Sequence, residues 1–349
     1  MEEPLFPEWT VAVGLMIGAA IGSFLNVVIY RMPLGKSLSN PPHSFCPACE
    51  HRLGVPDLVP LFSWLFLRGR CRHCKGRIPA RYFFVEVVTG GIWAAFWWQY
   101  LIAGWDPARA VALMLFSACL IAATYIDLRW FIIPDEINAL MLGIGAAYNV
   151  VLYAQARPEA TTWGIPSSLA GALFGVGALW AVTFLGRLLF RKDAMGHGDI
   201  KMARGIGAVL FPMAAGMSFA VAVALGAVLG AVQILVRRRP APEAEQEEAD
   251  GNLTEDVEPE SLGSILRCGL GYVLCIDVIG LALPKLYERW FGEEAYAVES
   301  IEEEDVEVEA TVIPFGPYLA LGAIVVALFE GPLGRLASSY WQWATGERP

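Results

Sequence analysis

The chain alternates long apolar runs with short polar segments, and this pattern predicts a bundle of membrane-spanning helices. An apolar run of about 18 residues or more is typical of a helix that crosses a bilayer. Eight helices are predicted, at about residues 10–30, 83–103, 108–126, 136–154, 168–190, 200–213, 215–235 and 317–334. The sixth is the weakest prediction, because it is short for a span and contains Arg204. We therefore expect an all-α polytopic membrane protein.

The composition supports this class. Of 349 residues, 56% are hydrophobic and 17% are charged, whereas soluble domains contain roughly 25% charged residues. The formal net charge of -10 comes from one segment, residues 240–312, which holds 20 of the 35 acidic residues and three of the 25 basic ones. The rest of the chain is therefore net positive, as expected for a membrane protein with basic cytoplasmic loops.

The basic residues also predict the orientation. The loop 31–81 carries nine Lys and Arg against two acids, Glu50 and Asp57, which marks the cytoplasmic side. The sequence before the first apolar run lacks a basic region, so we expect that run to be a retained helix. With the amino terminus outside, Asp127 and Asp199 both fall near the inner surface. We thus expect a multi-pass membrane protein with both aspartates near its cytoplasmic face.

These two aspartates are the candidate catalytic residues. Each lies at the edge of an apolar segment, where a carboxylate is costly unless it has a function. Two carboxyl groups that share a low-dielectric site do not easily ionise together, so one can act as an acid and the other as a base. The pattern indicates an aspartyl protease. Helix capping is an alternative for Asp199. Gly196 and Gly198 are expected to adopt positive φ and to let a substrate strand approach.

Four cysteines predict a metal site in the basic loop. Cys46 and Cys49 form one Cys-x-x-Cys pair, and Cys71 and Cys74 form a second, with 21 residues between the pairs. Four thiolates at this spacing typically hold one Zn²⁺ in a small zinc-ribbon-like domain. A structural role is favoured, because four thiolates leave no open position for water. A histidine in place of one thiolate is a second possibility.

The acidic segment 240–312 interrupts the helical pattern. Its flanks, 240–262 and 293–309, predict solvated or disordered chain. The stretch 265–286 is apolar, and we interpret it as a re-entrant or interfacial helix. Small apolar residues alternate with acids or threonine at Val306, Val308, Ala310 and Val312, which is compatible with a short strand.

Five motifs in order give the chain a resemblance to the type IV prepilin peptidases. They are residues 22–33, the two cysteine pairs followed by 79–82, residues 126–135, the Gly-x-Gly-Asp-x-Lys at 196–201, and residues 313–317. The resemblance covers nearly the whole chain except 240–312 and the extreme ends.

The resemblance implies that the chain cleaves the leader of type IV prepilins and type II secretion pseudopilins after a glycine, on the cytoplasmic side. It further implies N-methylation of the new terminal residue from S-adenosylmethionine. The family's catalytic aspartates correspond to Asp127 and Asp199, and its zinc ligands to the four cysteines. Because no glycine-rich Rossmann loop is present, no residue is assigned to S-adenosylmethionine.

Several other charged residues have two interpretations. Asp135 and Glu136 are expected to cap a helix, and Lys201 pairs either with a carboxylate or with lipid phosphate. Glu86 either pairs with Arg81 or binds the methyl-accepting amine, and the structural role is favoured.

We divide the chain into four parts. Residues 1–104 form the methyltransferase part with its zinc loop, 105–239 the peptidase core, 240–312 the acidic insertion, and 313–349 the last helix and tail. We expect pilin substrates and membrane lipid as partners, and no nucleic acid. Two alternatives are a proton or cation transporter with buried aspartates, and a peptidase without methylation.

Overall fold

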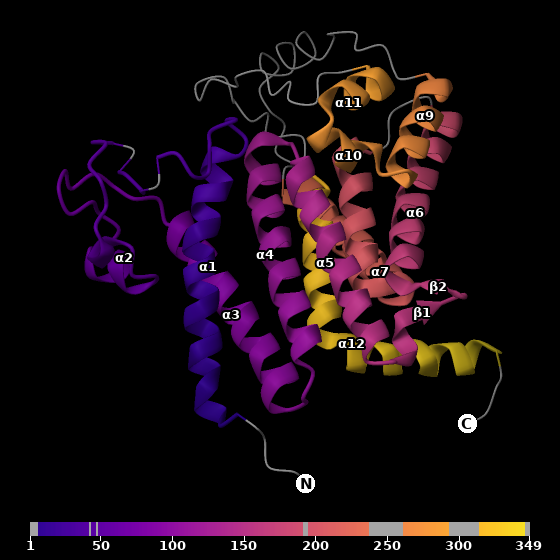
Figure 1. The fold of residues 1–349 in the computed structure, drawn as a ribbon, viewed down its shortest axis with the longest axis horizontal. Helices are drawn as coiled ribbons and strands as arrows, with labels where there is room; N and C mark the ends of the chain where they lie inside the picture. The colour runs from indigo at the N-terminus through magenta and orange to yellow at the C-terminus, as the bar shows by residue number, and fades with distance from the viewer. Residues whose placement is uncertain are drawn as a thin grey trace.

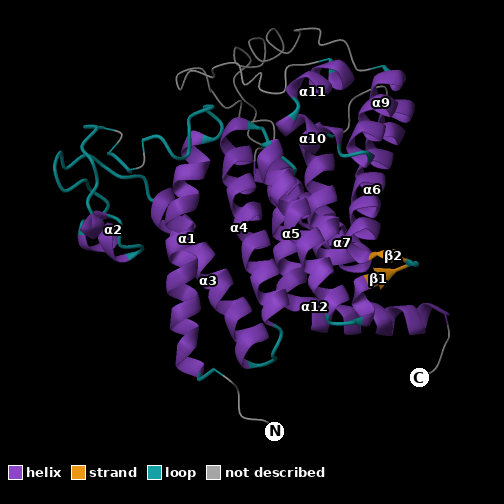
Figure 2. Ribbon diagram, viewed as in Figure 1, coloured by secondary structure: helices purple, strands orange, loops and turns teal. Residues whose placement is uncertain are grey.

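Helices make up nearly all of the fold. The computed structural model describes residues 6–41, 43–46, 48–190, 195–236, 261–292 and 314–345. Within these ranges the one sheet is a short antiparallel hairpin of β1 (Thr161–Thr162) and β2 (Ile165–Pro166). Figure 2 shows this hairpin at the side of a helical bundle. The prediction of an all-α membrane protein with a small cysteine-bearing loop domain is confirmed.

The long helices stand side by side, and the short ones lie at the ends of the bundle or beside it (Figure 1). The α-helices are α1 (Val11–Arg31), α2 (Phe62–Phe66), α3 (Arg81–Trp97), α4 (Pro107–Trp130), α5 (Asp135–Ala154), α6 (Ser167–Phe190), α7 (His197–Val236), α9 (Leu262–Val273), α10 (Ile276–Ala282), α11 (Pro284–Phe291) and α12 (Gly316–Thr345). Single helical turns occur at η1 (Glu8–Thr10), η2 (Val55–Asp57), η3 (Trp98–Ile102) and η4 (Pro158–Ala160), and η3 continues α3 directly.

The helix α7 consists of two helices joined at a sharp break. Phe211 has φ 64° and ψ 170°, and the next residue is Pro212, which has no N–H to donate to the preceding turn. Before the break α7 runs antiparallel to α6, since Gly207 meets Gly171 and Ala203 meets Gly175. After the break it runs along α12 instead. The two halves therefore correspond to the sixth and seventh predicted spans.

The helices are long and apolar enough for a multi-pass membrane protein. Five of the described helices, with α7 counted as one helix, are long and apolar enough to cross a membrane. The bent pair α9–α10 would make a sixth. At 1.5 Å per residue α7 would be roughly 60 Å long, about twice the hydrocarbon thickness, so its halves are better treated as separate spans. With α3–η3 and the apolar part of α12, Gly316–Glu330, apolar helices occupy all eight predicted positions.

The predicted helix at 265–286 is wrong as a single element. Three helices, α9, α10 and α11, replace it, and α9 and α10 meet at an angle of 69°. Cys275 between them has φ 54°, which ends the first helix. The indole of Trp180 on α6 donates to the carbonyl of Ile265 at 3.0 Å and fixes α9 against α6. A re-entrant shape is thus compatible with the bend. The possible strand at 306–312 lies outside the described residues.

Small residues let the helices of the bundle approach closely. A Cβ added at Gly171 would overlap the backbone of Gly207, and one added at Gly175 would overlap that of Ala203. Without a hydrophobic driving force between helices in lipid, such close packing is a main source of their association. This contact fixes the first half of α7, and hence the position of Asp199.

We predict that Gly171→Ala destabilises the protein, because the added methyl group has no space at the α6–α7 crossing. The expected loss is about 1–3 kcal/mol, typical of overpacking. Gly177→Ala is the matched control on the same helix, because nothing lies within 4 Å of a Cβ at that position. Thermal unfolding in detergent measures both variants. Equal unfolding temperatures for the two variants would contradict the proposed packing.

Candidate active site and candidate metal centre

Asp127 lies in the last turn of α4, at the end of a mostly buried helix. The helix stops three residues beyond it, because Phe131 adopts the left-handed conformation with φ 55°; its N–H donates to the Asp127 carbonyl at 3.0 Å. The Asp127 side chain is buried, at 5% exposure. Gly316, the first residue of α12, lies directly against its carboxylate, and a Cβ there would collide with Oδ2. Only glycine therefore fits at position 316 beside this acid.

Asp199 lies in the first turn of α7 and is partly buried. Its backbone N–H donates to the carbonyl of Gly196 at 3.2 Å. Gly198 packs against the side chain of Ile133, 3.3 Å from the position of a Cβ. The expectation of positive φ at Gly196 and Gly198 is wrong, since neither is among the glycines with this conformation. Gly198 instead lets α7 pack against the segment that follows α4.

Three helix ends thus bring the two acids together: the end of α4, the start of α7 and the start of α12. The carboxylate of Asp127 interacts electrostatically with Asp199 and with the backbone N–H of Gly316. Within the described part of the chain, Oδ2 of Asp127 is buried and has no hydrogen-bond partner. Repulsion between the two carboxylates, together with the buried oxygen that has no partner, favours protonation of one of the two aspartates. The arrangement can supply an acid and a base to one substrate.

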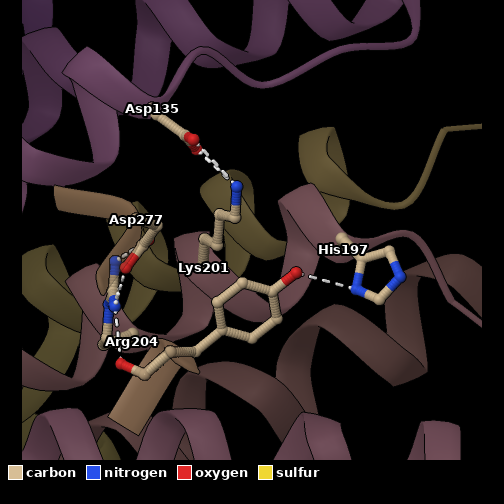
Figure 3. A network of polar contacts seen from close by, with 6 residues as sticks. Asp135, His197, Lys201, Arg204 and Asp277 are labelled. Carbon is tan, nitrogen blue, oxygen red and sulfur yellow. Dashed lines mark hydrogen bonds and ion pairs between the residues drawn. The ribbon is translucent and has the colours of Figure 1, made fainter. Parts of the chain in front are cut away.

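Beside the acids, the first half of α7 carries a buried cation with a defined partner. Lys201 donates to both oxygens of Asp135 at 2.8 Å, and its Nζ lies 5.4 Å from the ring centre of Tyr272. Of the two alternatives for Lys201, the carboxylate partner is therefore correct. Asp135 opens α5, but its carboxylate serves this ion pair rather than a cap. Figure 3 shows the contact together with its neighbours.

A second buried ion pair connects α7 to the insertion. Arg204 donates to the two oxygens of Asp277 at 2.8 and 2.5 Å, and also to the carbonyl of Tyr272 at 2.7 Å. The exposures of the two charged side chains are 2% and 0%. The Tyr272 hydroxyl lies 2.9 Å from Nδ1 of His197, two residues before Asp199 (Figure 3). The helices α9 and α10 therefore hold the segment that carries the second acid.

Sequence reasoning did not find this network. The sequence did contain a signal for the pair of Arg204 and Asp277, because the first lies in the shortest predicted span and the second in the apolar part of the insertion. Each charge is costly alone in an apolar helix, so the two were candidates for mutual pairing.

The four predicted cysteine ligands meet in the loop between α1 and α3. All four Sγ atoms of Cys46, Cys49, Cys71 and Cys74 lie within 4.8 Å of one another. The sulfurs of Cys46 and Cys74 are 3.9 Å apart, near the roughly 3.8 Å expected between sulfurs around tetrahedral zinc. The rings of His51 and His73, which neighbour these cysteines in the loop, lie with their centroids 3.5 Å apart and their planes tilted by 35°. The donor set fits Zn²⁺.

Hydrogen bonds from the loop backbone favour the thiolate form of these cysteines, which is the form that binds a cation. Backbone hydrogen bonds from Cys74 and His73 lower the pKa of Cys71 to about 7. A backbone hydrogen bond from His51 favours the Cys49 thiolate, yet the other three sulfurs help to raise the pKa of Cys49 to about 11. Four thiolates without a metal repel one another, so a bound cation is needed for all four to ionise.

Glu86 accepts a hydrogen bond from the backbone N–H of Leu61 at 2.7 Å and is 8% exposed. It ties the cysteine loop to α3. The alternative partner Arg81 instead places its guanidinium 5.2 Å from the ring centre of Tyr82.

Comparison with known proteins agrees with this geometry. Residues 16–100 match the bacterial peptidase A24 N-terminal domain, and residues 114–231 match the type IV leader peptidase family. A prepilin leader peptidase/N-methyltransferase of Myxococcus xanthus is 33% identical over 95% of this chain and 93% of its own. One from Pectobacterium carotovorum is 34% identical over 59% of this chain and 77% of its own. No solved structure matches the chain. These matches favour the peptidase over the transporter alternative.

We predict that the double variant Cys46→Ser/Cys71→Ser loses the bound metal. Wild-type protein is expected to contain one equivalent of zinc by elemental analysis, and its zinc content should fall as the pH is lowered, because the thiolates must be protonated for release. Cys268→Ser, outside the cluster, is the control and should keep its zinc. Full zinc content in the double variant would exclude the four-thiolate site.

We predict that Asp277→Ala strongly destabilises the protein, because it leaves the Arg204 charge buried without a partner. The expected cost is about 3–5 kcal/mol. Glu288→Gln, an exposed change on α11, should have little effect. The double variant Arg204→Met/Asp277→Leu should recover most of the stability, since no buried charge remains. If it unfolds as easily as Asp277→Ala, charge pairing is not the cause.

Proposed function

The chain belongs to the type IV leader peptidase family, and we propose that it removes the leader peptide from type IV prepilins and type II secretion pseudopilins. In this proposal it then methylates the new amino terminus, as the name prepilin leader peptidase/N-methyltransferase describes for its relatives. The electrostatic interaction between Asp127 and Asp199, at three converging helix ends, carries the peptidase assignment.

Asp127 and Asp199 act together on the scissile peptide bond. Hydrolysis of an amide needs a base that takes a proton from the attacking water and an acid that protonates the leaving nitrogen. A carboxyl pair that shares one proton supplies both, and the roles exchange as the proton moves. Burial of Asp127 supports this division, because desolvation and the neighbouring charge both favour retention of one proton.

The acids act on the cytoplasmic side of the membrane in this proposal. The end of α1 leads into the basic loop 31–81, and the positive-inside rule places such a loop in the cytoplasm. The chain reverses at each span, so the end of α4 and the start of α7 return to this side. The cut then falls after a glycine, where the leader meets the hydrophobic helix of the pilin.

We assign methyl transfer to residues 1–104, peptide cleavage to 105–239, and support of α7 to the insertion within 240–312. Zinc braces the loop of the first part through Cys46, Cys49, Cys71 and Cys74. S-adenosylmethionine would supply the methyl group.

We predict that Asp127→Asn and Asp199→Asn each reduce leader cleavage by about 10²-fold or more, the range expected for loss of acid–base catalysis. Asparagine keeps the shape of the side chain but can neither take up nor release a proton in this way. Cleavage of a prepilin in reconstituted vesicles, followed by mass spectrometry, measures the effect. Glu136→Gln, an exposed change at the start of α5, is the control. Normal cleavage by either asparagine variant would exclude the acid pair.

A further inference from the structure

A cavity of about 170 Å³ lies between α1, the start of α3 and the cysteine loop. On the scale at which one ordered water needs about 10–15 Å³, it has room for on the order of ten waters, and an engineered cavity of about 150 Å³ holds one benzene ring. Neither Asp127 nor Asp199 lines it. Because α4 packs against both α1 and α3, the cavity and Asp127 belong to one continuous bundle.

One wall of the cavity is aromatic. The rings of Trp64 and Phe83 stack with centroids 4.9 Å apart, and both line the cavity together with Tyr82. The indole nitrogen of Trp64 donates to the carbonyl of Ile78 at 3.4 Å, which fixes the ring in place. A flat purine base binds favourably against such a surface, because every base has a π-face.

Charged side chains also line the cavity, among apolar ones. Glu86 and Asp57 are both nearly buried there. Arg72 donates to Asp57 at 2.7 Å, and Arg31 and Arg77 also line the cavity. Carboxylates suit sugar hydroxyls and cationic groups, and guanidinium groups suit a carboxylate. Asn26 of α1 adds a buried amide.

The metal centre forms part of the same wall. Cys46 and Cys71, the two buried cysteines of the cluster, both line the cavity. A metal that joins the two cysteine pairs would therefore hold the wall in shape. The four sulfurs leave no open position on the metal, so its role here is to brace the loop.

We propose that this cavity is the binding site for S-adenosylmethionine, an inference that rests on the proposed methyltransferase function. The aromatic wall of Trp64 and Phe83 holds the adenine, and the ion pair of Asp57 and Arg72 contacts the ribose and the amino-acid end. Glu86 faces the positive charge of the sulfonium. A ligand with a purine, a sugar, a cationic sulfur and a carboxylate matches each of these features.

Photolabelling of the full wild-type chain tests the site directly. Purified protein is irradiated with radiolabelled S-adenosylmethionine, and the labelled peptide is identified by mass spectrometry. Label within residues 23–31 or 45–86 supports the proposal. Label elsewhere, or no specific binding by a chain that does methylate pilin, overturns it. A chain that neither binds the ligand nor methylates pilin would instead refute the methyltransferase function itself.

Variants then test the individual contacts. Glu86→Gln and Trp64→Ala should each weaken binding of S-adenosylmethionine about ten-fold or more, as expected for loss of a charged or stacked partner. Trp163→Ala, an exposed tryptophan beside the β-hairpin, is the matched control and should bind normally. Leader cleavage needs no methyl donor, so it reports in parallel whether each variant is folded. Unchanged affinity in both folded cavity variants would overturn the assignment.

Discussion

A charge inside an apolar helical bundle must find a partner on another segment, and this constraint organises the site. Arg204 meets Asp277, Lys201 meets Asp135, and Glu86 receives the N–H of Leu61. Asp127 and Asp199 differ from these pairs, because the charge that Asp127 meets has the same sign. A helix bundle keeps such an arrangement only if the surrounding structure enforces it. The pairs of Lys201 and Arg204 provide that enforcement for Asp199, since both anchor α7, the helix that carries it.

The helix breaks place the acids where a substrate can reach them. Phe131 ends α4 just after Asp127, and Phe211 with Pro212 turns α7 back toward the face at which it began. Gly316 admits the start of α12 to the same point. A substrate segment that approaches along the membrane surface would meet all three helix ends together. The candidate active site is thus built from helix termini rather than from helix interiors, and this leaves backbone groups near it that are not committed to a helical ladder.

The apolar pattern predicted the positions of the eight long segments, and the Cys-x-x-Cys spacing predicted the sulfur cluster. Both rest on local rules, namely the length of a span and the geometry of a metal knuckle. The pairing of Arg204 with Asp277 was not predictable in this way, because the two residues are far apart in sequence and their contact depends on how α9 and α10 bend. The same limit applies to Gly198, whose role is packing against Ile133 and not backbone freedom. Long-range contacts of this kind need the fold itself.

The account depends on Asp127 and Asp199 serving one substrate atom together. A structure by electron cryomicroscopy of the protein with a pilin peptide whose scissile amide is replaced by a hydroxyl-bearing group tests this most directly. We expect the hydroxyl to lie within hydrogen-bond distance of both carboxylates. An inhibitor bound with its hydroxyl against only one of them, or at a different group of residues, would contradict the account.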